Sequence, residues 1–260
     1  MTKRLLAAAL VAGFLAACVA SVLQFALTSP LILAAEKYET AETVAPAVHA
    51  FSGHAFANPL IVLAHSGHGA AGHDHGGEPQ WQPAPGLPRL AFTALATLVS
   101  GVGYALLLGA VLVAAGREVT PGEALKFGVG GFLAASLAPA IGLPPELPGV
   151  AAAALESRQL WWVATALATA SGLYLLAIRR GPVAIALGLA LIVAPHLWGA
   201  PHGPEDISAM PPVYAAQFAA RSLAIGFAFW AVLGLAFGWA WGTVAGKQDI
   251  ASGRRSGVPA

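Results

Sequence analysis

Six apolar stretches, each close to the length needed to cross a lipid bilayer, constrain this chain more than any other feature. They cover residues 5–27, 90–115, 124–143, 160–178, 183–198 and 219–244. A helical membrane span needs about 20 mostly apolar residues. Only 10% of the residues are charged, whereas soluble domains average about 25%. The sequence therefore predicts an all-α, polytopic membrane bundle of about six transmembrane helices.

The lysines and arginines indicate the orientation of these helices. If both termini are cytoplasmic, inner segments hold most of the basic residues, as the positive-inside rule expects. The inner set is Lys3, Arg4, Arg117, Lys126, Arg179, Arg180, Lys247, Arg254 and Arg255, and the outer set is Lys37, Arg89, Arg158 and Arg221. We therefore divide the chain into a first transmembrane helix (1–34), an outer His-rich loop (35–88), a five-helix membrane bundle (89–245) and a cytoplasmic tail (246–260).

Several classes of protein are disfavoured by the sequence. The net charge of +1 gives no reason to expect a nucleic-acid partner, and the single cysteine, Cys18, excludes an internal disulfide. Neither a phosphate-binding GxxxxGK[ST] loop nor the HExxH motif of zinc proteases occurs. Residues 15–18 resemble a lipoprotein cleavage box, but the apolar run continues to Leu27, which favours an uncleaved first helix.

Six of the eight histidines lie between His49 and His75, in the predicted outer loop. Neutral imidazole binds late first-row divalent metals such as Co, Ni, Cu and Zn. The densest part of the loop supplies the predicted ligands His65, His68, His73 and His75, with Asp74 as an added oxygen donor. Their irregular spacing favours capture or buffering of a metal over a preformed tetrahedral site. The alternative is a merely hydrophilic linker.

The second and fourth apolar stretches share a phrase. Thr-Ala-Leu-Ala-Thr occurs at 93–97 and at 165–169, followed by Ser-Gly and Tyr in both. The stretches that come next end alike, in Ala138-Pro139 and Ala194-Pro195. This pattern indicates a tandem hairpin repeat, a device of transporters, with chance matching between Ala/Leu-rich helices as the alternative. The two prolines are candidates for a gate or site, or simple helix terminators.

Three further residues form a predicted site at the outer mouth of the bundle. His196 and His202 flank the end of the fifth stretch, and Glu146 lies between prolines on the preceding outer loop. An ionisable residue at membrane depth is a functional candidate by default, although a packing histidine and a solvated glutamate are the ordinary alternatives. Glu36, Glu39 and Glu42 would share one face if their segment is helical.

Two patterns in the apolar stretches predict packing. Gly234, Gly238 and Gly242 form a doubled GxxxG motif that lets another helix approach closely, within the bundle or in a homo-oligomer. The tryptophans are expected in interfacial belts, where their amphipathic rings meet the lipid headgroups. They include Trp161, Trp162, Trp198, Trp230, Trp239 and Trp241.

Several segments together resemble the CbtA family, the larger membrane subunit of a proposed cobalt transporter. They are the opening MTKRLLAAALVAGFLAA, the LAAEKYE segment, the histidine loop, LAPAIGLPPELPG, RQLWW and APHLWGAPHGPE. The resemblance implies cobalt uptake across the bacterial inner membrane, linked to cobalamin supply. It also implies a small one-span partner, CbtB, which carries histidines of its own.

The sequence thus predicts a multi-pass transport subunit for a divalent metal in contact with the lipid bilayer, without a tightly bound cofactor and without an enzymatic activity. The transported ion would be Co²⁺, with Ni²⁺ or Zn²⁺ as chemical alternatives. A membrane-anchored protein that senses or buffers metal without conducting it is the first rival. A metalloenzyme with His196, His202 and Glu146 as ligands is the second.

Overall fold

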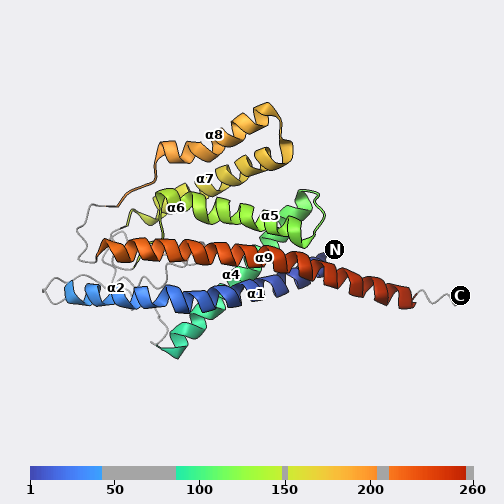
Figure 1. Cartoon of the computed structure of the whole chain (residues 1–260), viewed down its shortest axis with the longest axis horizontal. Helices are drawn as coiled ribbons and strands as arrows, with labels where there is room; N and C mark the ends of the chain where they lie inside the picture. Colours follow the sequence, from blue (N-terminus) through green and yellow to red (C-terminus); the bar gives the residue numbers. More distant parts are fainter. Residues whose placement is uncertain (43–85, 148–151, 204–210, 256–260) are drawn as a thin grey trace, which may run out of the picture. The chain divides into compact units, whose positions relative to one another are not determined.

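The structure, a computed structural model, describes residues 1–42, 86–147, 152–203 and 211–255, with side chains described for all of these except 37, 39–42 and 245–255. Every regular element in these ranges is helical (Figure 1). The elements are α1 (Thr2–Leu27), α2 (Ser29–Glu42), α4 (Leu87–Ala114), α5 (Pro121–Phe132), the π-helix η1 (Leu133–Leu137), α6 (Ala138–Gly142), α7 (Leu155–Tyr174), the π-helix η2 (Leu175–Arg179), α8 (Pro182–Trp198) and α9 (Pro212–Arg255).

Five helical segments of the described chain are long and apolar enough to cross a membrane. They are Thr2–Leu27, Leu87–Ala114, Pro121–Gly142, Leu155–Arg179 and Pro212–Val244. Helix α8 is apolar as well but has only 17 residues. These segments match the six predicted stretches, and the last one begins earlier than predicted, at Pro212 instead of residue 219. The prediction of a polytopic helical membrane bundle is confirmed.

In α1, small residues face the protein interior and large apolar residues face outward. Helix α1 buries only alanine and glycine, while Leu6, Leu10, Phe14 and Val22 are exposed. A soluble helix would show the reverse arrangement. Lipid is as apolar as leucine, so membrane helices associate by close packing of small residues. The burial pattern therefore agrees with a lipid environment.

The chain forms two compact units, and each is described by itself. The first comprises Met1–Ser21, Ala91–Gly131 and Phe227–Ala260, and the second comprises Val22–Leu90 and Phe132–Gly226. The boundaries therefore fall inside α1, α4, α5 and α9.

Close helix approaches build the first unit. A Cβ on Gly234 would lie 2.5 Å from the carbonyl oxygen of Ala124, and one on Gly238 would lie 2.5 Å from Cα of Pro121. The predicted GxxxG packing is therefore confirmed for these two glycines, within the chain and against α5. Gly242 has no such neighbour in the described part of the chain. Arg4 of α1 donates a hydrogen bond to the Trp241 carbonyl oxygen (2.9 Å).

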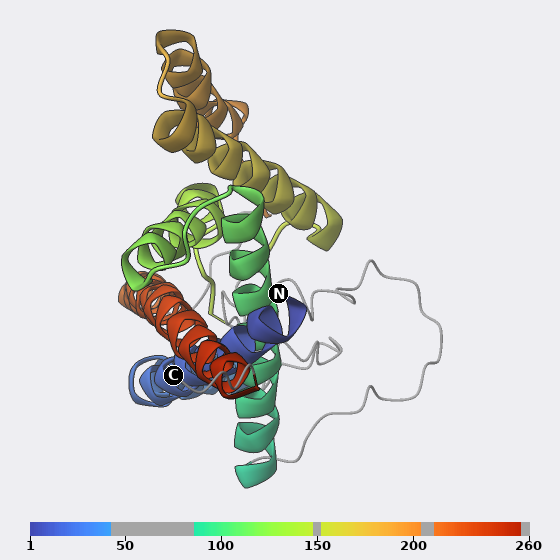
Figure 2. The same cartoon turned by 90° about the vertical axis from the view of Figure 1, so that its right-hand side faces the viewer.

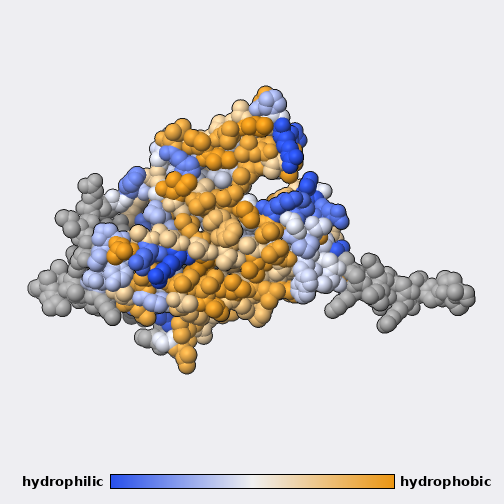
Figure 3. Space-filling view, in the orientation of Figure 1, coloured by the Kyte–Doolittle hydropathy of each residue, from blue (hydrophilic) through white to orange (hydrophobic). Residues whose placement is uncertain are grey.

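An antiparallel hairpin of α7 and α8 is the main feature of the second unit (Figures 1 and 2). A Cβ on Gly172 would lie 2.6 Å from the carbonyl oxygen of Gly188, and one on Gly188 would lie 2.9 Å from that of Gly172. The two backbones can approach this closely because neither residue has a side chain. The outer surface of α8 is hydrophobic, and hydrophilic residues gather at the α7–α8 turn, where Arg179 and Arg180 are exposed (Figure 3).

Two of the tryptophans predicted to lie in interfacial belts are buried within the protein. Trp161 is only 8% exposed and Trp230 only 4%. Each indole covers a glycine, Gly142 in the case of Trp161 and Gly131 in the case of Trp230. Because these glycines have no side chain, each indole can pack against the helix backbone. The hydropathy of the sequence does not reveal this space. Trp198 and Trp239 are exposed, and the position of the tryptophans in interfacial belts stays a prediction.

Candidate functional site

The two Ala-Pro motifs lie inside the last turns of their helices. Pro139 comes three residues before the end of α6, and Pro195 comes three residues before the end of α8. The carbonyl oxygen of each proline accepts a hydrogen bond from the first residue after the helix. Leu143 N–H donates to the Pro139 oxygen at 2.8 Å, and Gly199 N–H donates to the Pro195 oxygen at 3.1 Å. Neither proline terminates its helix, and α8 is continuous through Pro195. The two Ala-Pro motifs therefore have the same position and the same hydrogen bond in their helices, as a tandem repeat would require. The repeat itself stays a prediction.

One difference separates these two helix ends. Pro139 is buried and lies two residues after the end of η1, where the Ala138 N–H donates to the Leu133 carbonyl oxygen, five residues back. Pro195 is partly exposed and lies in a regular α-helix. A single π-turn in an α-helix is rare and often marks a functional position. Only the first of the two candidate breaks therefore has an altered hydrogen-bond register.

The indole of Trp161 joins three chain segments at one end of the second unit. A Cβ on Gly142, the last residue of α6, would lie 2.6 Å from the indole and 2.8 Å from Ala200 Cβ. The imidazole of His196 packs edge-on against the same indole, with ring centroids 6.1 Å apart. The end of α6, the first turns of α7 and the end of α8 therefore meet here, as expected if they share one membrane face.

Glu146 lies in the segment between α6 and α7 and forms an ion pair that the sequence analysis missed. Arg158 donates a hydrogen bond from Nη2 to Glu146 Oε2 at 2.8 Å, and the two side chains are 30% and 28% exposed, respectively. Burial raises the pKa of the Glu146 carboxyl above its usual range, and the positive charge of Arg158 only partly offsets this effect. The carboxylate is therefore incompletely stabilised by its partner.

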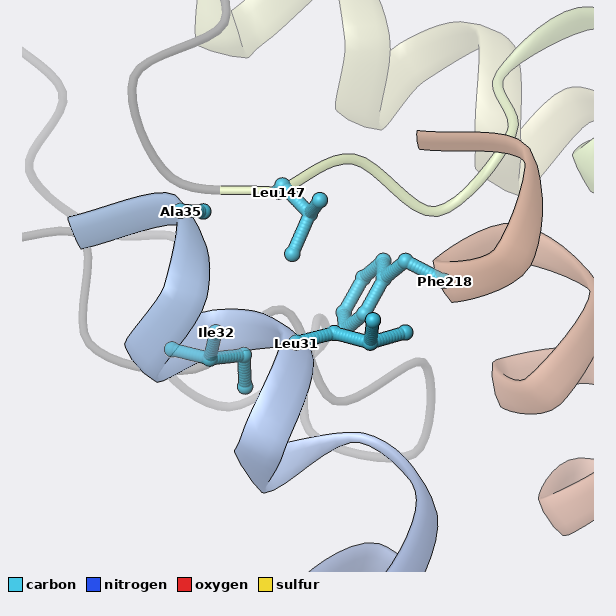
Figure 4. Packing of buried hydrophobic residues seen from close by; sticks show 5 residues of the cluster. All are labelled: Leu31, Ile32, Ala35, Leu147 and Phe218. Atoms are coloured by element: carbon cyan, nitrogen blue, oxygen red, sulfur yellow. The ribbon is translucent and has the colours of Figure 1, made fainter. Parts of the chain in front are cut away.

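A hydrophobic cluster fixes the backbone beside Glu146. Leu147 is 3% exposed, and its side chain points into the space between Ala35 of α2 and Phe218 of α9 (Figure 4). Leu31 and Ile32 complete the cluster from α2. Burying a leucine side chain contributes roughly 1.5–3 kcal/mol. The position of Glu146 is thus held by an apolar anchor on one side and by Arg158 on the other.

The predicted glutamate face of α2 is only partly described. The helix extends to Glu42, so the three glutamates do have helical spacing. Glu36 accepts a hydrogen bond from Arg89 at 3.0 Å, in an ion pair that lies wholly in the second unit. The side chains of Glu39 and Glu42 lie outside the described residues.

The predicted metal ligands are only partly within view. His65, His68, His73 and His75 lie outside the described residues. His196 is half-buried beside Trp161, Glu146 is paired with Arg158, and His202 is exposed. No group of three or more His, Cys, Asp or Glu side chains able to hold a metal ion occurs in the described ranges. The structure therefore does not gather Glu146, His196 and His202 into a ligand set, and their role stays a prediction.

Buried polar atoms without a protein partner form a second, unpredicted feature. Among the described residues they are Gln24 Nε2, Trp161 Nε1, Thr165 Oγ1, Thr169 Oγ1 and Ser222 Oγ. Three of them recur every four residues along α7 and therefore share one face of that helix. In the sequence, the two threonines stand out only as part of a repeated phrase. Their signal there is the spacing of polar residues by four in an apolar span.

Comparison with known proteins extends over nearly the whole described chain. A family model described as "Probable cobalt transporter subunit (CbtA)" matches residues 2–242. Searches of curated proteins and of solved structures give no match. The family match includes four candidate spans in full, the fifth up to residue 242, and the segments with Glu146, His196 and His202. The chain belongs to the CbtA family of transporter subunits.

Proposed function

We propose that this chain is the conducting membrane subunit of a cobalt uptake system in the bacterial inner membrane. Both termini would be cytoplasmic and the His-rich loop would lie outside. The observation that carries the proposal is the family match over residues 2–242, together with five candidate spans and the shorter apolar helix α8. The excess of basic residues in the inner segments supports the orientation.

In this proposal the ion is gathered by His65, His68, His73 and His75 and then passes to Glu146, His196 and His202. The meeting of the α6 and α8 ends around Trp161 supports a common mouth. The raised pKa of Glu146 supports a role for its carboxylate, because a divalent cation would supply the stabilisation that Arg158 supplies only in part. Such sites must bind weakly so that the ion can leave again.

The proposed system needs a partner and a driving force. The family description calls the protein a subunit, and a small one-span, His-containing protein of the CbtB type is the proposed partner. The membrane potential favours cation entry by about 2.3 kcal/mol per charge per 100 mV. The proposal includes Co²⁺ as substrate, with Ni²⁺ and Zn²⁺ as competitors, no tightly bound cofactor, and a link to cobalamin supply.

Accumulation of labelled cobalt in bacterial cells that lack their own uptake systems tests the proposal. The cells express the chain with its small partner, either unaltered or as the His196→Ala/His202→Ala variant. We expect saturable accumulation that the double variant abolishes. A well-expressed chain without accumulation would overturn the proposal. The same assay in the presence of excess Ni²⁺ or Zn²⁺ measures selectivity: if neither ion reduces the accumulation of labelled cobalt, the uptake is selective for cobalt.

The pH outside the cell provides a second readout of histidine capture. Histidine must lose its proton to bind a metal, and its ordinary pKa is about 6.5. Cobalt accumulation at a limiting concentration should therefore fall as the outer pH decreases from 7.5 to about 5.5. A flat profile over this interval would exclude capture by histidine.

A sensing or buffering protein that does not conduct is the alternative function. Deletion of residues 49–78 separates the two. In the proposed transporter the deletion lowers accumulation at limiting cobalt, while in a sensor it changes the response to metal and leaves cobalt flux intact. A metalloenzyme would require tightly held, stoichiometric metal after purification.

A further inference from the structure

Helix α7 carries a row of three buried polar groups that have no partner in the described protein. Trp161, Thr165 and Thr169 are 8%, 0% and 3% exposed. The Nε1–H of the tryptophan and both threonine hydroxyls lack hydrogen-bond partners there. With a rise of about 1.5 Å per residue, the row extends over roughly 12 Å of the helix. It lies within the candidate span Leu155–Arg179.

Such a row is unusual in a membrane helix. A threonine hydroxyl in an apolar helix ordinarily bonds the carbonyl oxygen of the preceding turn. Thr97 of α4 does so, with Oγ1 donating to the Thr93 carbonyl oxygen at 2.9 Å, and it is just as buried at 1% exposure. Thr165 and Thr169 have the same option within α7 and do not take it. Their hydroxyls therefore remain available to a ligand on the packed face.

One of the segments that pack against α7 has an incomplete hydrogen-bond ladder, whereas α8, its other main neighbour, is a regular α-helix. The π-helix η1 contacts α7 within the second unit. It is followed by Pro139, which has no N–H, so one carbonyl oxygen of this segment loses its helical donor. Irregular backbone at membrane depth is tolerated where it is buried in protein or lines a polar path. Two unusual features, the unpartnered row and the π-turn, thus occur in neighbouring elements.

We propose that the α7 face bearing Trp161, Thr165 and Thr169 forms part of the path of a partly hydrated divalent cation. This inference rests on the proposed function and adds the membrane-depth part of the route. His196, whose ring contacts the Trp161 indole, connects the row to the predicted outer mouth. The row is closed to solvent here, so passage of the ion requires α7 to separate from the helices that pack against its buried face.

The chemistry of the row suits passage better than storage. Neutral hydroxyl oxygens are weak ligands for a late first-row metal, compared with imidazole or thiolate. A threonine hydroxyl can replace a water ligand of the ion, or it can form a hydrogen bond with a water that stays bound to the ion. The Trp161 N–H cannot coordinate a cation but can donate to a water or counter-anion travelling with it. A series of weak contacts allows the ion to enter and to leave.

Isosteric replacement of the hydroxyls tests the inference, with α4 as an internal control. The Thr165→Val/Thr169→Val variant keeps the side-chain shape and removes both oxygens. With the small partner present, we expect its initial rate of cobalt accumulation to fall about tenfold. Thr97→Val should stay within about twofold of the unaltered chain, since that hydroxyl bonds only its own helix. Thr165→Ser/Thr169→Ser restores the hydroxyls and should restore the rate.

The outcomes separate this inference from the function on which it rests. If the unaltered chain accumulates no cobalt, the proposed function fails. If it does, and the valine pair matches Thr97→Val at equal membrane abundance, the inference alone fails.

A labelling experiment decides the case if the valine pair does not reach the membrane. Thr169→Cys is made in a Cys18→Ser background and treated, within membranes, with a small methanethiosulfonate reagent. We expect modification of the introduced thiol and slower modification in the presence of Co²⁺. An unreactive thiol in a correctly inserted chain would show that no polar path reaches this face and would overturn the inference.

Discussion

Helices α4 and α7 carry the same phrase, Thr-Ala-Leu-Ala-Thr, with different hydrogen bonding. Thr97 in α4 and Thr169 in α7 occupy the same position of the phrase and are almost equally buried, at 1% and 3% exposure. The α4 hydroxyl bonds its own backbone, whereas the α7 hydroxyl has no partner in the described chain. Sequence and burial alone therefore do not determine the use of a polar group in a membrane helix. The surroundings of the α7 phrase include two further elements, since α7 contacts both α8 and the π-helix η1.

The two helices agree in their other contacts. In both helices, the backbone of another helix packs closely against the glycine that follows the phrase. A Cβ on Gly101 would lie 2.7 Å from the Gly13 carbonyl oxygen, and one on Gly172 would lie 2.6 Å from the Gly188 carbonyl oxygen. Both also begin with an arginine that binds a glutamate from another segment, as Arg89 binds Glu36 and Arg158 binds Glu146. The unpartnered hydroxyls are therefore a departure from a shared packing scheme.

The largest expected effect on stability comes from substitution of the two glycines that follow the repeated phrase. Gly101→Ala and Gly172→Ala should each destabilise the folded chain by roughly 1–3 kcal/mol, since the new methyl group must push away a main-chain carbonyl. Gly103→Ala is the control, because nothing lies within 4 Å of its Cβ position, and it should be neutral or slightly stabilising. Thermal unfolding in detergent measures all three. Equal melting temperatures for all three variants would mean that close packing at Gly101 and Gly172 does not stabilise the protein.

The second prediction concerns the arginine at the start of α7. Arg158→Met leaves the half-buried Glu146 carboxylate unpaired and should cost about 1–2 kcal/mol at pH 7. Burial already raises the pKa of Glu146 above its unfolded value, and the substitution should raise it further. A raised carboxyl pKa means that stability is lost as the pH rises through it, so the loss should shrink as the pH falls towards the ordinary glutamate range.

Unfolding measured across this pH interval checks the prediction. The Arg158→Met/Glu146→Gln variant removes the charge and should lose the pH dependence. A loss that is the same at every pH would argue against an unpaired carboxylate as its cause.

The smallest effect is the most specific to the comparison. Thr97→Val removes a hydrogen bond and should cost about 0.5–1 kcal/mol, whereas Thr165→Val/Thr169→Val removes only unpartnered groups and should be neutral or stabilising. Melting temperatures of the purified variants give the sign. A stability gain combined with a loss of transport is typical of residues retained for function. Equal losses in both variants would assign the α7 threonines to packing.

Hydropathy was sufficient to predict the spans but not their internal geometry. All six predicted stretches are helical, because a bilayer leaves no other local solution for a chain of this composition. The π-turn before Pro139 and the inward turn of Trp161 were not predictable, since both depend on the shape of the neighbouring helix. The same holds for the Glu146–Arg158 pair, whose members lie on different segments. The histidines of the loop lie outside the described residues, and their role rests on composition alone.

Cobalt influx into liposomes tests most directly whether this chain itself conducts the ion. The chain and its small partner are reconstituted around a cobalt-quenched fluorophore, with an inside-negative potential applied, and protein-free liposomes and the Thr165→Val/Thr169→Val variant are measured in parallel. If the chain conducts cobalt, we expect quenching that needs the chain, saturates with external Co²⁺ and is slower in the variant. Correctly folded chain that admits no more cobalt than protein-free liposomes would contradict it and favour a sensing or buffering role.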